Sequence, residues 1–74
     1  MNKVRRIQLA AISEKLSIVR AELEAIRDEE QEYNDNVPEG LRNTSTCENS
    51  DEAISSMEDI ISSLEEYEST LTEY

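Results

Sequence analysis

Acidic and amide side chains are concentrated between residues 28 and 39, which read D-E-E-Q-E-Y-N-D-N-V-P-E. Oxygen-bearing residues at positions 1, 3, 5, 7, 9 and 12 of this stretch follow the spacing of an EF-hand calcium loop. Such a loop needs glycine at position 6 for its sharp turn, where this chain has Tyr33, and position 11 is Pro38. The segment is therefore interpreted as a solvated acidic helix end, and no metal site is predicted.

The chain contains no histidine, one cysteine and one glycine. These counts exclude a histidine-based catalytic triad, a His or Cys metal cage, a disulfide within the chain and a glycine-rich phosphate loop. Cys47 has acidic rather than basic neighbours, so its thiol is not activated and we interpret it as small apolar filler. No catalytic, cofactor-binding or metal-ligating residue is predicted, and the chain is not expected to be an enzyme.

Two stretches of the chain repeat apolar residues in alternating steps of three and four, which is the heptad pattern of packed helices. Pro38 and Gly40 interrupt the pattern between them. We predict a helix over about 3–35, a loop over about 36–44 and a helix over about 45–72, whose start Thr44, or Ser45 with Glu48, can cap. The predicted seams are Leu9, Ile12, Leu16, Val19, Leu23 and Ile26 in the first helix, and Ala53, Met57, Ile60, Leu64, Tyr67, Leu71 and Tyr74 in the second.

A loop of this length makes consecutive helices antiparallel neighbours. Counting outward from a turn near residue 40 brings apolar residues of the two seams opposite each other, and it pairs Glu30 with Ser50 and Tyr33 with Cys47. A polar residue such as Glu30 within a seam is expected to fix the register. The predicted fold is all-α, a single coiled-coil-like antiparallel two-helix hairpin over residues 1–74.

Domains of fewer than about 70–80 residues rarely build a sufficient core without a staple, and oligomerisation is the common staple that this composition leaves open. Four isoleucines lie off the predicted main seams, namely Ile7, Ile18, Ile54 and Ile61. We therefore expect a homodimer in which these residues mediate self-association, giving a four-helix arrangement with two-fold symmetry.

Charge is distributed unevenly along the chain, whose net charge is −11. Residues 1–20 carry five bases and one acid, so antiparallel folding is expected to place Lys3, Arg5, Arg6 and Lys15 beside Glu65, Glu66, Glu68 and Glu73. The remaining acids gather at the loop end, and those predicted to bind a partner are Asp28, Glu29, Glu32, Asp35, Glu39, Glu48, Asp51 and Glu52. Such a surface repels nucleic acid and anionic membranes and attracts basic protein surfaces.

No stretch of the sequence has the length and apolar character of a membrane span or of a signal-peptide core. We therefore expect no association with a membrane and a cytoplasmic location. The single cysteine is compatible with a reducing compartment.

A further pattern lies between about residues 22 and 66. It consists of Ile26 to Tyr33 (I-R-D-E-E-Q-E-Y), Asp35, Asn36, Pro38, Glu39, Leu41, Glu48, Glu52, Ala53 and Ile54. With these residues the region resembles small acidic helical-hairpin proteins of phages and prophages that have no assigned function. The resemblance departs at Cys47, where the pattern has an aromatic residue, and at Asn43, where it has glycine. It implies a mobile-element origin and hence a host cytoplasm, and it implies no catalytic residues.

Two functional hypotheses follow. The first is a non-enzymatic interaction module that self-associates and presents an acidic surface to a basic protein; its sharper form is a phage-type inhibitor that mimics nucleic acid and blocks a host nucleic-acid-binding or defence protein. The second is a structural or assembly accessory coiled coil with no inhibitory role.

Overall fold

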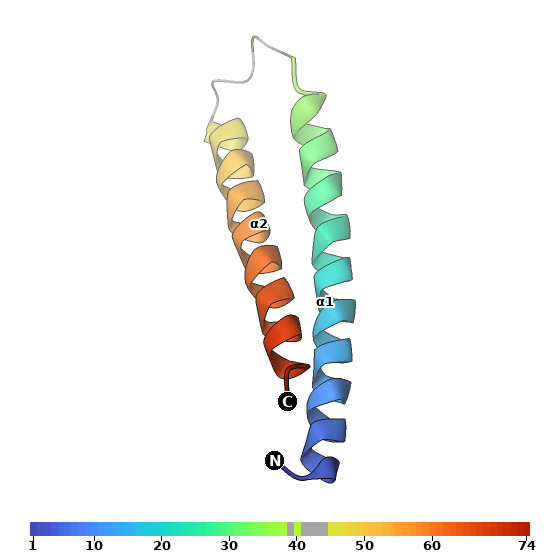
Figure 1. Cartoon of the computed structure of the whole chain (residues 1–74). Coiled ribbons are helices and arrows are strands. Elements are labelled where there is room, and N and C mark those ends of the chain that lie inside the picture. Colours follow the sequence, from blue (N-terminus) through green and yellow to red (C-terminus); the bar gives the residue numbers. More distant parts are fainter. Residues whose placement is uncertain (39, 41–44) are drawn as a thin grey trace.

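The computed structural model describes residues 1–38, 40 and 45–74, and for residues 45–47 it describes the backbone alone. Helix α1 spans Lys3–Asp35 and helix α2 spans Ser45–Leu71. The two helices lie side by side and antiparallel in a rod that measures 59 × 14 × 13 Å, with both termini at the end away from the loop (Figure 1). The predicted all-α helical hairpin is therefore confirmed. The caps expected at Thr44 or Ser45 lie outside the described residues.

Local hydrogen bonds define both ends of α1. The Asn2 side chain caps the first turn, since its Oδ1 accepts the Arg5 backbone N–H at 2.8 Å. At the other end, the Asn36 backbone N–H donates to the carbonyl oxygens of Glu32 and Tyr33. Pro38 follows two residues later and has no N–H with which to continue the helix. The end of α1 is thus encoded locally, next to the loop that reverses the chain.

Each helix contacts the other along a single seam. Successive residues of a seam are spaced three and four positions apart in turn. Ile54 and Ile61 are the buried apolar residues of this interface, and the leucines around them are half-buried. The seam of α1 is Leu9, Ser13, Leu16, Arg20, Leu23, Arg27, Glu30 and Asn34, and the seam of α2 is Ser50, Ile54, Met57, Ile61, Leu64, Glu68 and Leu71. Every second member of the α1 seam is polar, so the core of the hairpin is narrow.

The predicted α1 seam is wrong in one of its two rows. Ile12, Val19 and Ile26 were expected to face α2, but they are 45%, 50% and 55% exposed. The leucine row faces α2 as expected, together with a polar row that contains Ser13 and Asn34. This phase prevails because α2 offers hydrogen-bond partners: the Ser13 hydroxyl donates to the Glu68 carbonyl oxygen at 3.0 Å, and the Asn34 amide donates to Asp51 Oδ1 at 2.6 Å.

The row of α2 that faces α1 also differs from the predicted one. Ile54 and Ile61, which were expected to lie on a self-association surface, are only 6% and 5% exposed and form the core of the hairpin. Ile60 and Tyr67, which were expected in the seam, are 49% and 56% exposed. By the register of the Ser13–Glu68 and Glu30–Ser50 contacts, Ile54 and Ile61 lie level with Arg27 and Arg20 in the polar row of α1.

The predicted register is confirmed near the loop, where the Ser50 hydroxyl donates to Glu30 Oε1 at 2.7 Å. Tyr33 is 58% exposed, and the Cys47 side chain expected opposite it lies outside the described residues. At the other end, α1 is about 50 Å long and α2 about 40 Å, so the first turns of α1 extend beyond the end of α2 (Figure 1).

The expected neutralisation of the basic start by the end of α2 is not what the structure shows. Among the described residues, no ion pair involves Lys3, Arg5, Arg6 or Lys15. Arg20 instead pairs with Glu65 and Glu68. The overhang of α1 explains the difference, because it carries the first three bases past the acidic end of α2.

Replacing Glu30 by leucine and Ser50 by alanine should raise the melting temperature. The change removes a half-buried carboxylate and its hydroxyl partner from the seam and adds apolar contact beside Ile54. We expect a gain of about 1 kcal/mol, which corresponds to roughly 4–8 °C for a domain of this size. Thermal unfolding followed by circular dichroism at fixed protein concentration measures it.

The Glu29→Leu variant is the control, since it removes the same charge from an exposed position on the same helix turn. An equal rise in the control would assign the effect to charge removal, and a fall in the double variant would show that the Glu30–Ser50 pair is itself stabilising.

Candidate functional site

The acidic residues predicted to bind a partner gather at the loop end of the hairpin. The structure places Asp28, Glu29, Glu32 and Asp35 on the last turns of α1 and Glu48, Asp51 and Glu52 on the first turns of α2, and all seven are exposed. Glu39 lies outside the described residues. The antiparallel fold thus brings the two acidic segments to one end of the rod, as expected.

Three members of the acidic loop end take part in hydrogen bonds within the hairpin. Asp28 Oδ1 accepts two hydrogen bonds from Arg27, at 3.0 and 3.1 Å. Asp35 accepts from the Gln31 amide, and Asp51 accepts from the Asn34 amide. Because Asn34 is neutral, its hydrogen bond orients the Asp51 carboxylate without compensating its charge.

The residues predicted for self-association separate into two groups. Ile54 and Ile61 belong to the core of the hairpin and are not available to a second copy. Ile7 and Ile18 are 61% and 57% exposed. Ile18 comes two residues before the seam residue Arg20, and at about 100° per residue this places it on the side of α1 that points away from α2.

A larger apolar surface, which the sequence reasoning had assigned to the seam, lies along one side of the hairpin. Seven of its eight residues directly precede a seam residue of one row, the row of Ser13 and Arg20 in α1 or the row of Ile54, Ile61 and Glu68 in α2. The eighth, Tyr74, continues the spacing of seven in α2. In two antiparallel helices that face each other, the same rotation from the seam leads to the same side of the pair. We call this surface the apolar side: Ile12, Val19, Ile26 and Tyr33 from α1, with Ala53, Ile60, Tyr67 and Tyr74 from α2.

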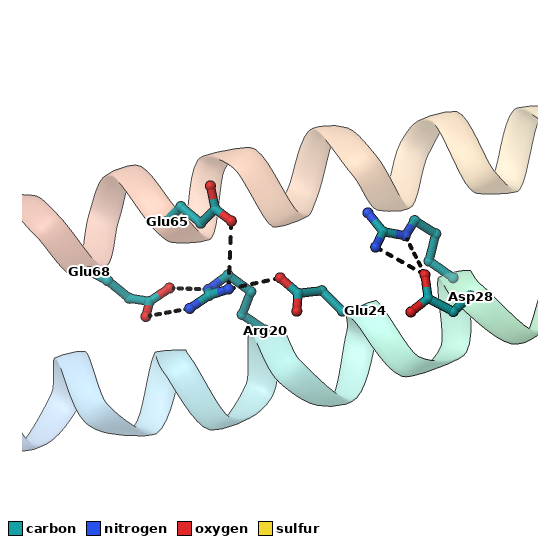
Figure 2. Close-up of polar contacts among 6 residues, drawn as sticks. Arg20, Glu24, Asp28, Glu65 and Glu68 are labelled. Carbon is teal, nitrogen blue, oxygen red and sulfur yellow. Dashed lines mark hydrogen bonds and ion pairs between the residues drawn. The ribbon is translucent and has the colours of Figure 1, made fainter.

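The opposite side of the hairpin is polar and is organised by Arg20. Figure 2 shows its guanidinium reaching Glu24 on its own helix and Glu65 and Glu68 on α2. Arg20 Nε donates to Glu68 Oε2 at 2.7 Å, and Nη1 donates to Glu24 Oε1 at 2.7 Å. Nη2 also donates to the second oxygen of Glu68 at 3.5 Å. Arg20 is thus the ionic link between the two helices among the described residues.

The charge of Arg20 does not change over the working pH range. The hydrogen bond to Glu68, and then the one to Glu24, raise the pKa of the Arg20 guanidinium further above its ordinary value. A raised pKa means that the contribution of Arg20 to stability is present below its ordinary pKa in the unfolded chain and is lost only at still higher pH. Arg20 therefore acts as a permanent positive charge.

The described residues offer no enclosed reaction site. They form no pocket, and no three of their acidic or cysteine side chains are grouped as metal ligands would be. Within the same part of the chain, no helix is both long and apolar enough to cross a membrane. The described surface presents an acidic end, an apolar side and a polar side.

The apolar side could have been found from the sequence by one signal. Ser13, Arg20, Arg27 and Asn34 recur at steps of seven, in phase with the leucines. Polar residues of α2 lie within about one helix turn of the levels of Ser13, Arg20 and Asn34, namely Glu68, Glu65 and Asp51. A polar row with this spacing, whose side chains can reach polar residues of α2, competes with the apolar row for the position that faces α2.

Arg20→Gln should lower the melting temperature by several degrees, because it removes the charge that joins Glu65 and Glu68 to α1 and leaves those acids beside Glu24. Arg20→Lys should recover only part of the loss, since an ammonium cannot reproduce the forked contacts. Arg27→Gln is the matched control: Arg27 has similar exposure, and its described ion pair is with the adjacent Asp28. Thermal unfolding at low and high salt measures both, and equal losses for Arg20→Gln and Arg27→Gln would contradict the assignment.

No protein-family model, curated protein or solved structure matches this chain. The phage-type resemblance accordingly stays a prediction from the residues. The surfaces described above are the basis on which function is proposed.

Proposed function

We propose that this chain is a non-enzymatic protein-interaction module that self-associates through the apolar side of the hairpin and presents its acidic loop end to a basic protein partner. One observation carries the proposal: exposed apolar residues and exposed acids occupy different parts of the same rod. The apolar side is suited to contact that excludes water, and the acidic end is suited to contact between opposite charges.

The charge distribution supports a basic partner. The net charge is −11, and Arg27 is the one base among the described residues of the loop end, where it is engaged with Asp28. A concentrated field of one sign steers an oppositely charged partner toward it and makes association strongly dependent on salt. The same field disfavours direct contact with nucleic acid or with an anionic membrane.

The sharper form of the proposal is a nucleic-acid mimic that blocks a host nucleic-acid-binding or defence protein, in line with the phage-type resemblance. Its support is the outer row of α2, where Glu52, Asp59, Glu66 and Glu73 recur every seven residues and are all exposed. Successive members stand about 10 Å apart along the helix. A regular row of carboxylates on a rigid rod is a surface that a phosphate-binding protein can accept.

The second candidate is a structural or assembly accessory coiled coil with no inhibitory role. It is favoured by the apolar side, because exposed apolar rows at heptad spacing are typical of helices that complete a larger bundle. The two candidates differ in which residues they need: the accessory requires the apolar side, and the mimic requires the acidic end.

Reversing three charges at the loop end, with Glu29, Glu32 and Glu52 each changed to lysine, should weaken capture of basic proteins at least tenfold. The physical reason is the loss of the local negative field, which supplies both attraction and orientation. Capture from a bacterial lysate by the immobilised chain, quantified at low and high salt and in competition with duplex DNA, measures this effect.

The matched control reverses three exposed acids outside both the loop end and the outer row of α2, Glu14, Glu22 and Glu58, which gives the same net charge. Proteins that the control retains and the loop-end variant loses identify the acidic end as the binding site. If both variants lose the same proteins equally, binding depends on total charge and the proposed site is wrong. If duplex DNA does not displace the captured proteins, the proposal that the chain mimics nucleic acid is contradicted.

A further inference from the structure

The apolar side leaves seven large side chains half-exposed in a continuous band. Their exposed fractions run from 45% for Ile12 to 60% for Tyr74. The band follows one long side of the hairpin, along residues 12–33 of α1 and along residues 60–74, in and just after α2. Its members are Ile12, Val19, Ile26, Tyr33, Ile60, Tyr67 and Tyr74.

We infer that the occupant of the apolar side is a second copy of this chain, packed with α1 against α1 and α2 against α2 so that the two loops lie at opposite ends. This inference rests on the self-association in the proposed function and adds the face and the orientation. The two-fold axis then runs across the rod and passes through both apolar rows.

The α1 row is self-complementary about Val19. When α1 is laid antiparallel on a second α1 with Val19 opposite Val19, Ile12 falls opposite Ile26 of the second copy, because each lies seven residues from the axis. The same count puts Tyr33 opposite Arg5, where a guanidinium can stack on the ring. Every large residue of the row thus meets an apolar or ring-binding partner.

The α2 row is self-complementary about a point between residues 63 and 64. Ile60 then falls opposite Tyr67 of the second copy, and Ala53 falls opposite Tyr74, so that a small residue meets a large one. A single two-fold axis requires this point on α2 to lie level with Val19 on α1. The register between α1 and α2 within one hairpin tests this requirement independently.

The observed register comes close to that requirement. Ser13 contacts Glu68 and Glu30 contacts Ser50 across the hairpin. By these contacts Val19 lies level with residue 61 or 62, about two residues from the centre of the α2 row. An axis through Val19 therefore shifts the α2 pairing by about one helix turn from the one described above.

Charge selects this orientation over the one in which both loops lie together. Loops at the same end would bring two acidic loop ends side by side. The opposed arrangement instead sets Lys15 of each copy at the level of Glu22 in the other, on the same side of the α1 pair. Lys15 makes no ion pair within the described part of the hairpin.

The test begins with mass and affinity. Sedimentation equilibrium of the full chain at micromolar concentration should give twice the 8.5 kDa of one chain. Val19→Glu should weaken the dimer at least a hundredfold, because it places two carboxylates at the axis. Ile18→Glu, one residue away on the outer side of α1, should change the affinity less than threefold.

The orientation is tested by cross-linking in a Cys47→Ser background. Val19→Cys should form a covalent dimer under mild oxidation at least ten times faster than Ile18→Cys, read on a non-reducing gel. Mixing Ile12→Cys chains with Ile26→Cys chains should give a mixed covalent dimer, whereas neither variant alone should cross-link at that rate. Circular dichroism confirms that each variant retains its helices.

The failures are distinguishable. A mass of one chain at micromolar concentration overturns both this inference and the self-association in the proposed function. A dimer in which Val19→Cys cross-links no faster than Ile18→Cys overturns the orientation and leaves self-association standing. Neither result bears on binding by the acidic end, which the charge-reversal variants test separately.

Discussion

The link from Arg20 to Glu65 and Glu68 is the interaction on which the rest of the arrangement depends. A guanidinium within a helix seam needs partners that can accept several hydrogen bonds, and α2 supplies them at that level. With Ser13 and Asn34 also bonded to α2, α1 presents its polar row beside the leucines. The apolar row is then directed to one side of the hairpin. The phase of one helix therefore decides which surface the molecule exposes.

This choice has a consequence for stability. A seam with alternate polar residues buries little apolar surface, and within the described part of the hairpin Ile54 and Ile61 are the buried apolar residues. The α1 leucines, on the edge of the seam next to the apolar side, stay half-buried. A partner on the apolar side covers both the exposed row and the leucines behind it. Folding and association then contribute to one free energy, and stability depends on protein concentration.

Much of the fold follows from local features of the sequence. The rotation of each helix about its own axis, which decides which row of residues faces the other helix, does not; we call this rotation the phase of the helix. Pro38 and the heptad repeats predict two helices and a reversal, and counting from the turn correctly pairs Glu30 with Ser50. The phase is harder because two rows, one with Val19 and one with Arg20, adjoin the same leucines. Turning α1 by about 50° exchanges them. The apolar row has the stronger periodic signal, but the polar row has partners on α2, and only the structure shows that those partners are in reach.

The acidic site was more accessible to prediction than the apolar one, and for a physical reason. Exposed charges at the ends of antiparallel helices keep their position whichever way each helix is turned, so the loop-end acids did not depend on the phase. The two surfaces also constrain each other. In the opposed pair that we propose, Lys15 of one copy lies level with Glu22 of the other, which is outside the loop end. The acids of the loop end, including Glu48 and Glu52, then keep their field for a third protein. Because the loops lie at opposite ends of the pair, a dimer presents two such surfaces, and a partner with two basic sites gains avidity only if it spans the length of the rod.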